Sequence, residues 1–148
     1  MQIKPETDRI ILTFKACVDY QSSNAGKLIH NYWNASWHYY ITISDTHVFN
    51  FGGNGFAVFP IPSNTKQVTQ VKLLNKKEVL DRCLIAFQLF KDWHYGLLGW
   101  NCEHFARLVT TSEAVSYQVK ESPLAWLNHN GYHPLAMKIM NEAYLSYS

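Results

Sequence analysis

The sequence lacks most of the features that mark secreted, disulfide-bonded and membrane-spanning proteins. Its three cysteines, Cys17, Cys83 and Cys102, are odd in number, and no two of them have the CxxC spacing of metal or redox sites. A disulfide framework is therefore not expected. The apolar run that follows the polar start is only IIL, too short for the core of a signal peptide, and no segment approaches the roughly 20 apolar residues of a membrane span. We expect a cytoplasmic protein with no membrane span.

An excess of charge of one sign is also lacking. The 13 basic and 11 acidic residues are scattered and give a formal net charge of only +2, so we expect no binding to nucleic acid and no basic patch for a membrane surface. At 148 residues, 47% of them hydrophobic, the chain suits one globular domain over residues 1–148 with a sizeable core. No cofactor or metal ion is predicted, and the sequence leaves the oligomeric state open.

Aromatic side chains, by contrast, are abundant: the chain has five Trp, nine Tyr and eight Phe. Such a content indicates either a thick aromatic core or a cleft for an apolar ligand, and the core is the simpler interpretation.

Strand patterns come first along the chain and helical patterns later, which predicts an α+β fold with a small antiparallel sheet packed against helices. Aromatic and β-branched residues predict a hairpin whose strands, 37–43 and 47–51, flank the polar turn SDT. Segment 28–33, LIHNYW, fits either a short helix or an extended approach to that hairpin. The other elements that we expect are strands at 9–18 and 67–74, an edge strand or turn at 58–61, helices at 76–93, from about 101 and at 135–145, and a turn with a short extended piece at 110–119.

Cys102 lies at the start of one of these helices. Asn101 is a good N-cap residue, Glu103 is an acid in the first turn, and apolar residues then follow at helical spacing. The unpaired N–H groups and the partial positive charge of a first turn favour a thiolate over a thiol. Cys102 is therefore a candidate nucleophile, and the alternative is a buried, inert thiol.

A nucleophilic cysteine needs a base within hydrogen-bond reach, and His38 is the histidine best placed to supply it. His104 is two residues after Cys102, so its side chain points about 200° away around the helix. His47 borders the hairpin turn, about 16 Å along the strand from His38. The other candidates, which geometry does not exclude, lie in less regular segments: His94, His129 and His133.

The hairpin register then predicts the residue that orients the base. With SDT as a three-residue loop, Ile43 pairs with His47, Tyr40 with Asn50, and His38 with Gly52. Asn50 becomes a diagonal neighbour of His38 on the same face, about 7–8 Å away between Cα atoms. The predicted triad is Cys102, His38 and Asn50, with the amide holding the imidazole. A two-residue loop would turn Asn50 to the other face.

The segments that contain these residues resemble one family. YGLLGWNCEHFARLVTTSEAVSYQV resembles the NCEHF cysteine box of the lecithin:retinol acyltransferase (LRAT)-like, or H-box/NC, family, and HYYITISDTHVFNF resembles its histidine box. The resemblance covers about residues 37–119. It implies a circularly permuted papain-like fold of the NlpC type. Residues 1–36, which lack the family's usual GD-containing opening, and residues 120–148 are unassigned extensions.

The resemblance also implies roles for individual residues. Cys102 would be the thiolate nucleophile and His38 the general base, while Asn50 stands where the family commonly has a second histidine. Tyr95 and Asn101 match the motif and would shape the site, and the Cys102 backbone N–H would contribute to an oxyanion hole.

The activity implied by the resemblance is that of a thiol acyltransferase or phospholipase A-like hydrolase, which forms an acyl-cysteine intermediate on a phospholipid or other acyl substrate. Family members often carry a C-terminal membrane helix, but polar and charged residues run throughout residues 120–148, so no such anchor is expected. Two alternatives stay open. A papain-like peptidase or amidase would use the same residues on an amide, and a non-enzymatic H-box/NC interaction module would keep the fold without the chemistry.

Overall fold

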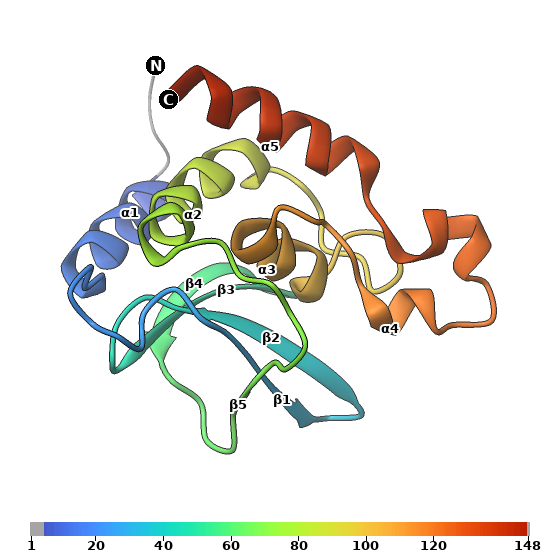
Figure 1. Cartoon of the computed structure of the whole chain (residues 1–148), viewed down its shortest axis with the longest axis horizontal. Helices are drawn as coiled ribbons and strands as arrows, with labels where there is room; N and C mark the ends of the chain where they lie inside the picture. The colour runs from blue at the N-terminus through green and yellow to red at the C-terminus, as the bar shows by residue number, and fades with distance from the viewer. Residues whose placement is uncertain (1–4, 148) are drawn as a thin grey trace.

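A computed structural model describes residues 5–147 of the chain. At its centre is a five-stranded antiparallel sheet in the order β4-β3-β2-β1-β5, with helices packed against one face (Figure 1). The fold is therefore α+β, as the sequence predicts. The strands are β1 (Leu28–Trp33), β2 (Ser36–Thr42), β3 (His47–Gly52), β4 (Gly55–Pro60) and β5 (Lys66–Gln67).

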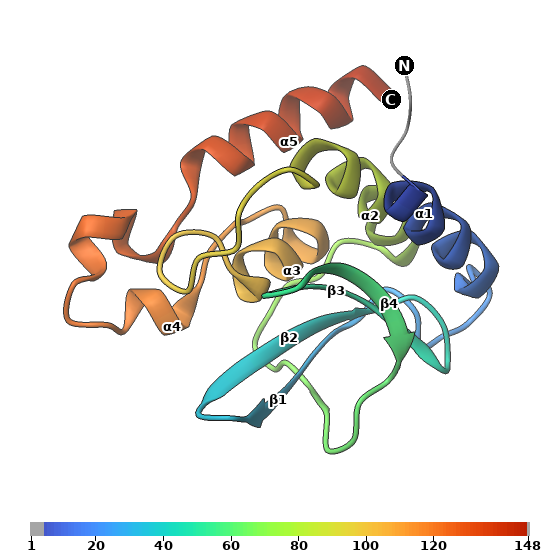
Figure 2. The same ribbon diagram turned by 180° about the vertical axis from the view of Figure 1, so that it is seen from behind.

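The helices build two layers over that face. Helix α3 (Cys102–Thr111) lies directly on β2 and β3, and α2 (Lys76–Phe90) lies beside it. Helix α1 (Pro5–Cys17) packs against the edge strand β4, and α5 (Pro134–Tyr147) runs across α2 (Figure 2). Between α3 and α5 the chain extends to one side and forms α4 (Tyr117–Lys120) and the 3-10 helix η1 (Ala125–Gly131).

The predicted register of the β2–β3 hairpin is confirmed. Ile41 pairs with Phe49 and Thr42 with Val48, and the Ile43 N–H donates to the His47 carbonyl at 3.0 Å. The loop therefore comprises residues 44–46. Within it, the Ser44 hydroxyl accepts the N–H groups of Thr46 and His47 and so closes the turn. Asn50 accordingly falls on the same face of the sheet as His38.

The hydrogen-bonded ladder between β2 and β3 is short, and the sheet opens beyond it. Pairing between these strands runs no further toward the start of β2 than Ile41 and Phe49, whereas β1 stays paired with β2 as far as Ser36. Residues 37–39 therefore have no strand partner on the β3 side. The N-terminus of α3 lies at this opening.

The predicted strand at 9–18 is wrong, because these residues belong to α1. Ile10, Phe14 and Cys17 recur at helical spacing and pack on the core, whereas Leu12 between them is 67% exposed. Glu6 and Asp8 in the first turn also favour a helix. The partial alternation of β-branched residues suggested a strand, but the burial pattern has the period of a helix.

The predicted strand at 67–74 is also largely wrong. Only Lys66 and Gln67 form β5, and Gln70 adopts a positive φ of 57°, which ends any extended run. The backbone beyond β5 bonds to separate elements, since the Val68 N–H donates to Leu28 and the Leu74 N–H to Thr110.

Other boundaries differ less from the predictions. Residues 110–111 continue α3, and α4 replaces the short extended piece expected before residue 119. Segment 28–33 is the strand β1, and residues 58–61 contribute to the edge strand β4. Helix α5 covers the range predicted for it, and α2 begins where predicted but ends at Phe90, before the expected end at residue 93.

The core is aromatic, in line with the simpler interpretation of the composition. Phe49 and Phe105 meet at 5.7 Å between ring centroids, and Phe56 packs against both. Cys83 is fully buried in the same cluster. A smaller apolar cluster on the opposite face of the sheet contains Ile29, Tyr40, Val48, Phe59 and Ile61.

Candidate functional site

Asn101 caps the helix that carries Cys102, as predicted. Its Oδ1 accepts the N–H groups of Glu103 at 2.9 Å and of His104 at 3.1 Å, and its own N–H donates to His104 Nδ1 at 3.1 Å. This reciprocal arrangement is a capping box. The Asn101 amide nitrogen also donates to the Leu97 carbonyl and to the Ser116 hydroxyl, so the turn before Cys102 is fixed from several directions.

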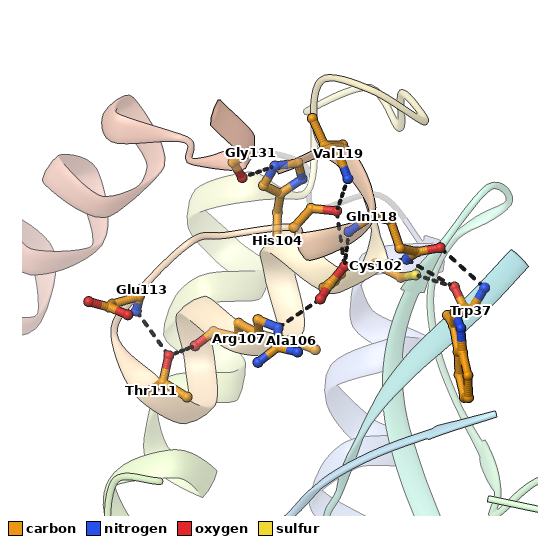
Figure 3. A network of polar contacts seen from close by, with 12 residues as sticks. Trp37, Cys102, His104, Ala106, Arg107, Thr111, Glu113, Gln118, Val119 and Gly131 are labelled. Atoms are coloured by element: carbon orange, nitrogen blue, oxygen red, sulfur yellow. Dashed lines mark hydrogen bonds and ion pairs between the residues drawn. The ribbon is translucent and has the colours of Figure 1, made fainter. Parts of the chain in front are cut away.

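Cys102 lies at the opening between β2 and β3. It is 3% exposed, and its Sγ–H donates to the Trp37 carbonyl with a sulfur–oxygen distance of 3.9 Å (Figure 3). The Tyr39 backbone and the Tyr95 hydroxyl also lie near the sulfur. The nucleophile predicted from the sequence is therefore enclosed by β2 and by the segment that precedes its own helix.

Burial raises the pKa of the Cys102 thiol above its usual value near 9. Hydrogen bonds from Tyr39, Tyr95 and the Glu103 backbone lower this pKa, but desolvation of the thiolate outweighs them. The sequence therefore predicts the helix start correctly, and burial opposes the thiolate that this start favours. In this conformation Cys102 is a protonated thiol at neutral pH.

His38 is held by β1 and the β1–β2 turn. Its Nε2 lies 3.2 Å from the Trp33 carbonyl oxygen and 3.3 Å from the Ser36 hydroxyl, and its ring stacks on Trp33 at 4.3 Å between centroids. Because a carbonyl oxygen only accepts, Nε2 carries the proton and Nδ1 carries the lone pair. Burial lowers the pKa of His38 below its usual value near 6.5, so the ring is neutral at pH 7 and Nδ1 can act as a base.

Asn50 completes the broken ladder between β2 and β3. Its amide nitrogen donates to the Tyr39 carbonyl at 2.9 Å, where a longer β3 pairing would have supplied a backbone N–H. The His38 imidazole bonds instead, through Nε2, to the Trp33 carbonyl, which accepts its proton, and to the Ser36 hydroxyl. The register brings Asn50 to the predicted face, but in this structure a backbone carbonyl and a hydroxyl hold the base.

One cavity of about 560 Å³ brings the predicted site residues together. Cys102, His38, Asn50 and Tyr95 all line it, whereas Asn101 acts from outside as the helix cap. Within the described part of the chain no hydrogen bond joins Cys102 to His38. The other lining residues are the glycine-rich tip of the β3–β4 hairpin and an apolar wall, namely Gly52, Gly53, Asn54, Gly55, Ala57, Trp33, Tyr40, Phe59, Pro60 and Pro62.

Behind Cys102 lies a buried polar network that the sequence analysis missed. Glu103 is 0% exposed, and its Oε2 pairs with Arg107 Nε at 2.9 Å. Its Oε1 accepts hydrogen bonds from the Ser116 hydroxyl at 3.0 Å and the Gln118 backbone N–H at 3.2 Å. Figure 3 shows Gln118 between Cys102 and Trp37. The i,i+4 spacing of Glu103 and Arg107 was the available signal.

His104 is a structural residue, as its position on the helix predicts. Its Nε2 donates to the Gly131 carbonyl at 3.0 Å while Nδ1 accepts from Asn101. Burial, followed by the nearby His133, lowers the pKa of His104 to about 4. The neutral ring thereby joins the start of α3 to the end of η1.

Within residues 5–147, no group of three or more His, Cys, Asp or Glu side chains could hold a metal ion, and no helix is both long and apolar enough to cross a bilayer. Cys17, Cys83 and Cys102 are all free thiols. Comparisons of the chain with known protein families, with curated proteins and with solved structures gave no match.

Proposed function

We propose that the protein is a thiol acyltransferase or phospholipase A-like hydrolase that works through an acyl-Cys102 intermediate. The observation that carries this proposal is the cavity, which joins the Cys102 thiol and the His38 imidazole to an apolar wall and has no charged residue in its lining. An uncharged, largely apolar space suits an acyl chain better than it suits a polar peptide. The resemblance to the LRAT-like family, with its permuted papain-like fold, supports the same activity.

The chemistry follows from the two side chains. His38 Nδ1 takes the proton from Cys102 Sγ, and the sulfur attacks the ester carbonyl carbon to form a tetrahedral intermediate. When this intermediate collapses, the C–O bond breaks and the alcohol leaves with the proton from His38. The resulting thioester is then attacked by water in hydrolysis, or by an alcohol or amine in acyl transfer. The Sγ–H must first leave the Trp37 carbonyl and turn toward His38.

Donors for the developing oxyanion come from the start of α3. The Cys102 N–H belongs to the first helical turn, and neither of the N–H groups bound by the Asn101 side chain is that of Cys102. The Tyr95 hydroxyl, beside the sulfur, is a second donor. Burial raises the pKa of Tyr95 to about 12, so this hydroxyl stays protonated and able to donate.

The direct test is to trap the acyl-enzyme. The protein is incubated with phosphatidylcholine that carries a labelled acyl chain, and intact mass is measured before and after hydroxylamine, which cleaves thioesters. We expect an added acyl group that Cys102→Ala abolishes and that the matched variant Cys17→Ala retains. If wild type gains no acyl group and its Cys102 shows no reaction with iodoacetamide between pH 7 and 10, the proposal fails.

One observation favours the non-enzymatic interaction module as a second candidate. The Cys102 thiol donates to a backbone carbonyl, and burial raises its pKa, which is the state of a structural cysteine. The same trapping experiment separates the two functions. An interaction module would form no thioester in wild type, and its Cys102→Ser variant would behave like wild type.

A further inference from the structure

Side chains replace a missing strand along the open edge of β2. The Trp37 N–H donates to Gln118 Oε1 at 3.2 Å, and Gln118 Nε2 donates back to the Trp37 carbonyl at 3.3 Å. Asn50 donates to the Tyr39 carbonyl in the same way, and the Cys102 thiol donates to the Trp37 carbonyl. Gln118 thus pairs with Trp37 as the backbone of a neighbouring strand would.

Gln118 is itself fixed in position. Both its backbone N–H, at 3.2 Å, and its Nε2, at 3.4 Å, donate to Glu103 Oε1. Glu103 is fully buried and forms an ion pair with Arg107. With a carboxylate and a carbonyl on one side and an N–H on the other, only one orientation of the amide satisfies all three partners.

The Trp37 carbonyl therefore accepts two donors, Gln118 Nε2 and Cys102 Sγ–H. When Cys102 loses its proton, one donor disappears and the negative sulfur faces the electron-rich carbonyl oxygen. Gln118 still satisfies that oxygen, which reduces the cost of making the thiolate. Without Gln118, the carbonyl would retain the thiol proton more strongly and would repel the thiolate more.

We propose that Gln118 is a positioning residue for Cys102, which sets through the Trp37 carbonyl how readily the sulfur gives up its proton. The inference rests on the proposed function only in naming Cys102 as the nucleophile. Among the described residues, four other titratable side chains face the sulfur. Glu103 is on its own helix and Tyr95 precedes that helix, while His38 and Tyr40 are on β2 and line the cavity. All of these side chains are retained when Gln118 is replaced, and among them Glu103 loses one hydrogen bond, the one that Gln118 Nε2 donates to its Oε1.

The test measures iodoacetamide alkylation of Cys102 as a function of pH, followed by peptide mass so that Cys17 and Cys83 are counted separately. In Gln118→Met the side chain keeps its length and loses its hydrogen bonds to the Trp37 N–H, the Trp37 carbonyl and Glu103 Oε1, while the backbone N–H to Glu103 remains. We expect the midpoint of the alkylation profile to move to higher pH, with a rate about three- to tenfold lower at any pH below the midpoint. Gln88→Met, an exposed glutamine-to-methionine change on α2, should leave the profile where it is.

The shape of the profile distinguishes positioning from mere packing. If Gln118→Met loosened the site, alkylation would become faster at every pH with the midpoint unmoved, and that result, like a profile identical to wild type, would overturn the proposal. Should Gln118→Met fail to fold, Gln118→Lys keeps a donor for Trp37 and gains Glu103 as an ion-pair partner. Its midpoint is expected at or below that of wild type, and a higher midpoint would contradict the inference. None of these readouts depends on acyl transfer, so the proposed function can fail separately.

Discussion

The two side chains that we propose to react, Cys102 and His38, are held by backbone carbonyls rather than by each other. Cys102 donates to Trp37 and His38 to Trp33. Sequence patterns could identify the cysteine from its helix start and the histidine from its strand, because these depend on residue type and spacing. Which atom holds each side chain could not be predicted, since every residue carries a carbonyl and the sequence does not mark the one that faces the site.

The lowered pKa of His38 predicts how acyl-adduct formation depends on pH. Protonated imidazole cannot accept the Cys102 proton, and burial lowers this pKa below 6.5. The rate should therefore still exceed half of its plateau at pH 6.5, then fall about tenfold per pH unit once the pH is below the pKa of His38. Initial rates between pH 4.5 and 8 measure this.

The variant His38→Asn serves as the control, because it should remove the pH-dependent rate altogether while the protein stays folded. An acidic limb whose half-maximal rate lies above pH 6.5 would contradict the assignment of His38 as the base.

At the level of secondary structure, the β1–β2 hairpin is the element that positions His38, the proposed base. Its turn residues Asn34 and Ala35 have positive φ values of 50° and 66°, the combination that a two-residue type I′ turn requires. The flanking residues Trp33 and Ser36 are the ones that hold His38. The sequence analysis left this strand undecided because Asn-Ala lacks the glycine that usually marks such a turn.

An alanine at positive φ is strained, so Ala35→Gly should stabilise the protein. We expect the free energy of unfolding to rise by about 1 kcal/mol, because glycine adopts this conformation without a steric penalty. Urea denaturation measures the change.

Ala16→Gly, an exposed position in α1, gives the matched control with the opposite sign, a loss of about 1 kcal/mol. If Ala35→Gly were as destabilising as Ala16→Gly, the turn would not have the conformation described.

Across the whole molecule, long-range polar contacts tie the C-terminal part of the chain to the cysteine helix. His104 is the central group, with Asn101 on one side and Gly131 on the other. The sequence predicted that His104 is structural, because helical geometry turns it away from Cys102. Its partner Gly131 lies outside the segments with a recognisable pattern, so this contact could be found only in the structure. The helix α1 was missed for a related reason, since its packing partners lie far along the chain.

The buried, neutral His104 predicts that stability falls in mild acid. Its pKa is lowered to about 4 in the folded protein from 6.5 when exposed, so between these pH values the unfolded chain binds a proton that the folded chain does not. The contribution of neutral His104 to the free energy of unfolding should therefore be fully present above pH 6.5. The free energy of unfolding should then fall by up to about 3 kcal/mol as the pH approaches 4. Urea denaturation at pH 4 to 7.5 measures it.

The exposed His94→Gln variant should give the same curve as wild type. A native-state NMR titration of His104 with a midpoint near 6.5, or a stability that does not change over this range, would contradict the prediction.

The Gly131 carbonyl also receives the Ser116 N–H, at 2.7 Å. A glycine is required there, since φ is +90° and an added Cβ would lie 2.5 Å from the Ser116 oxygen. The two ends of segment 117–130 are therefore held together by this hydrogen bond between Ser116 and Gly131. The part of the chain between them forms a loop that projects from the fold. A fluorescent or affinity label could be inserted after Leu127, which is exposed. The insertion would lengthen this loop between Gln118 and Gly131 without moving either end of it. The chain therefore offers, between two fixed ends, a place for a label that leaves Cys102 and the start of α3 in position.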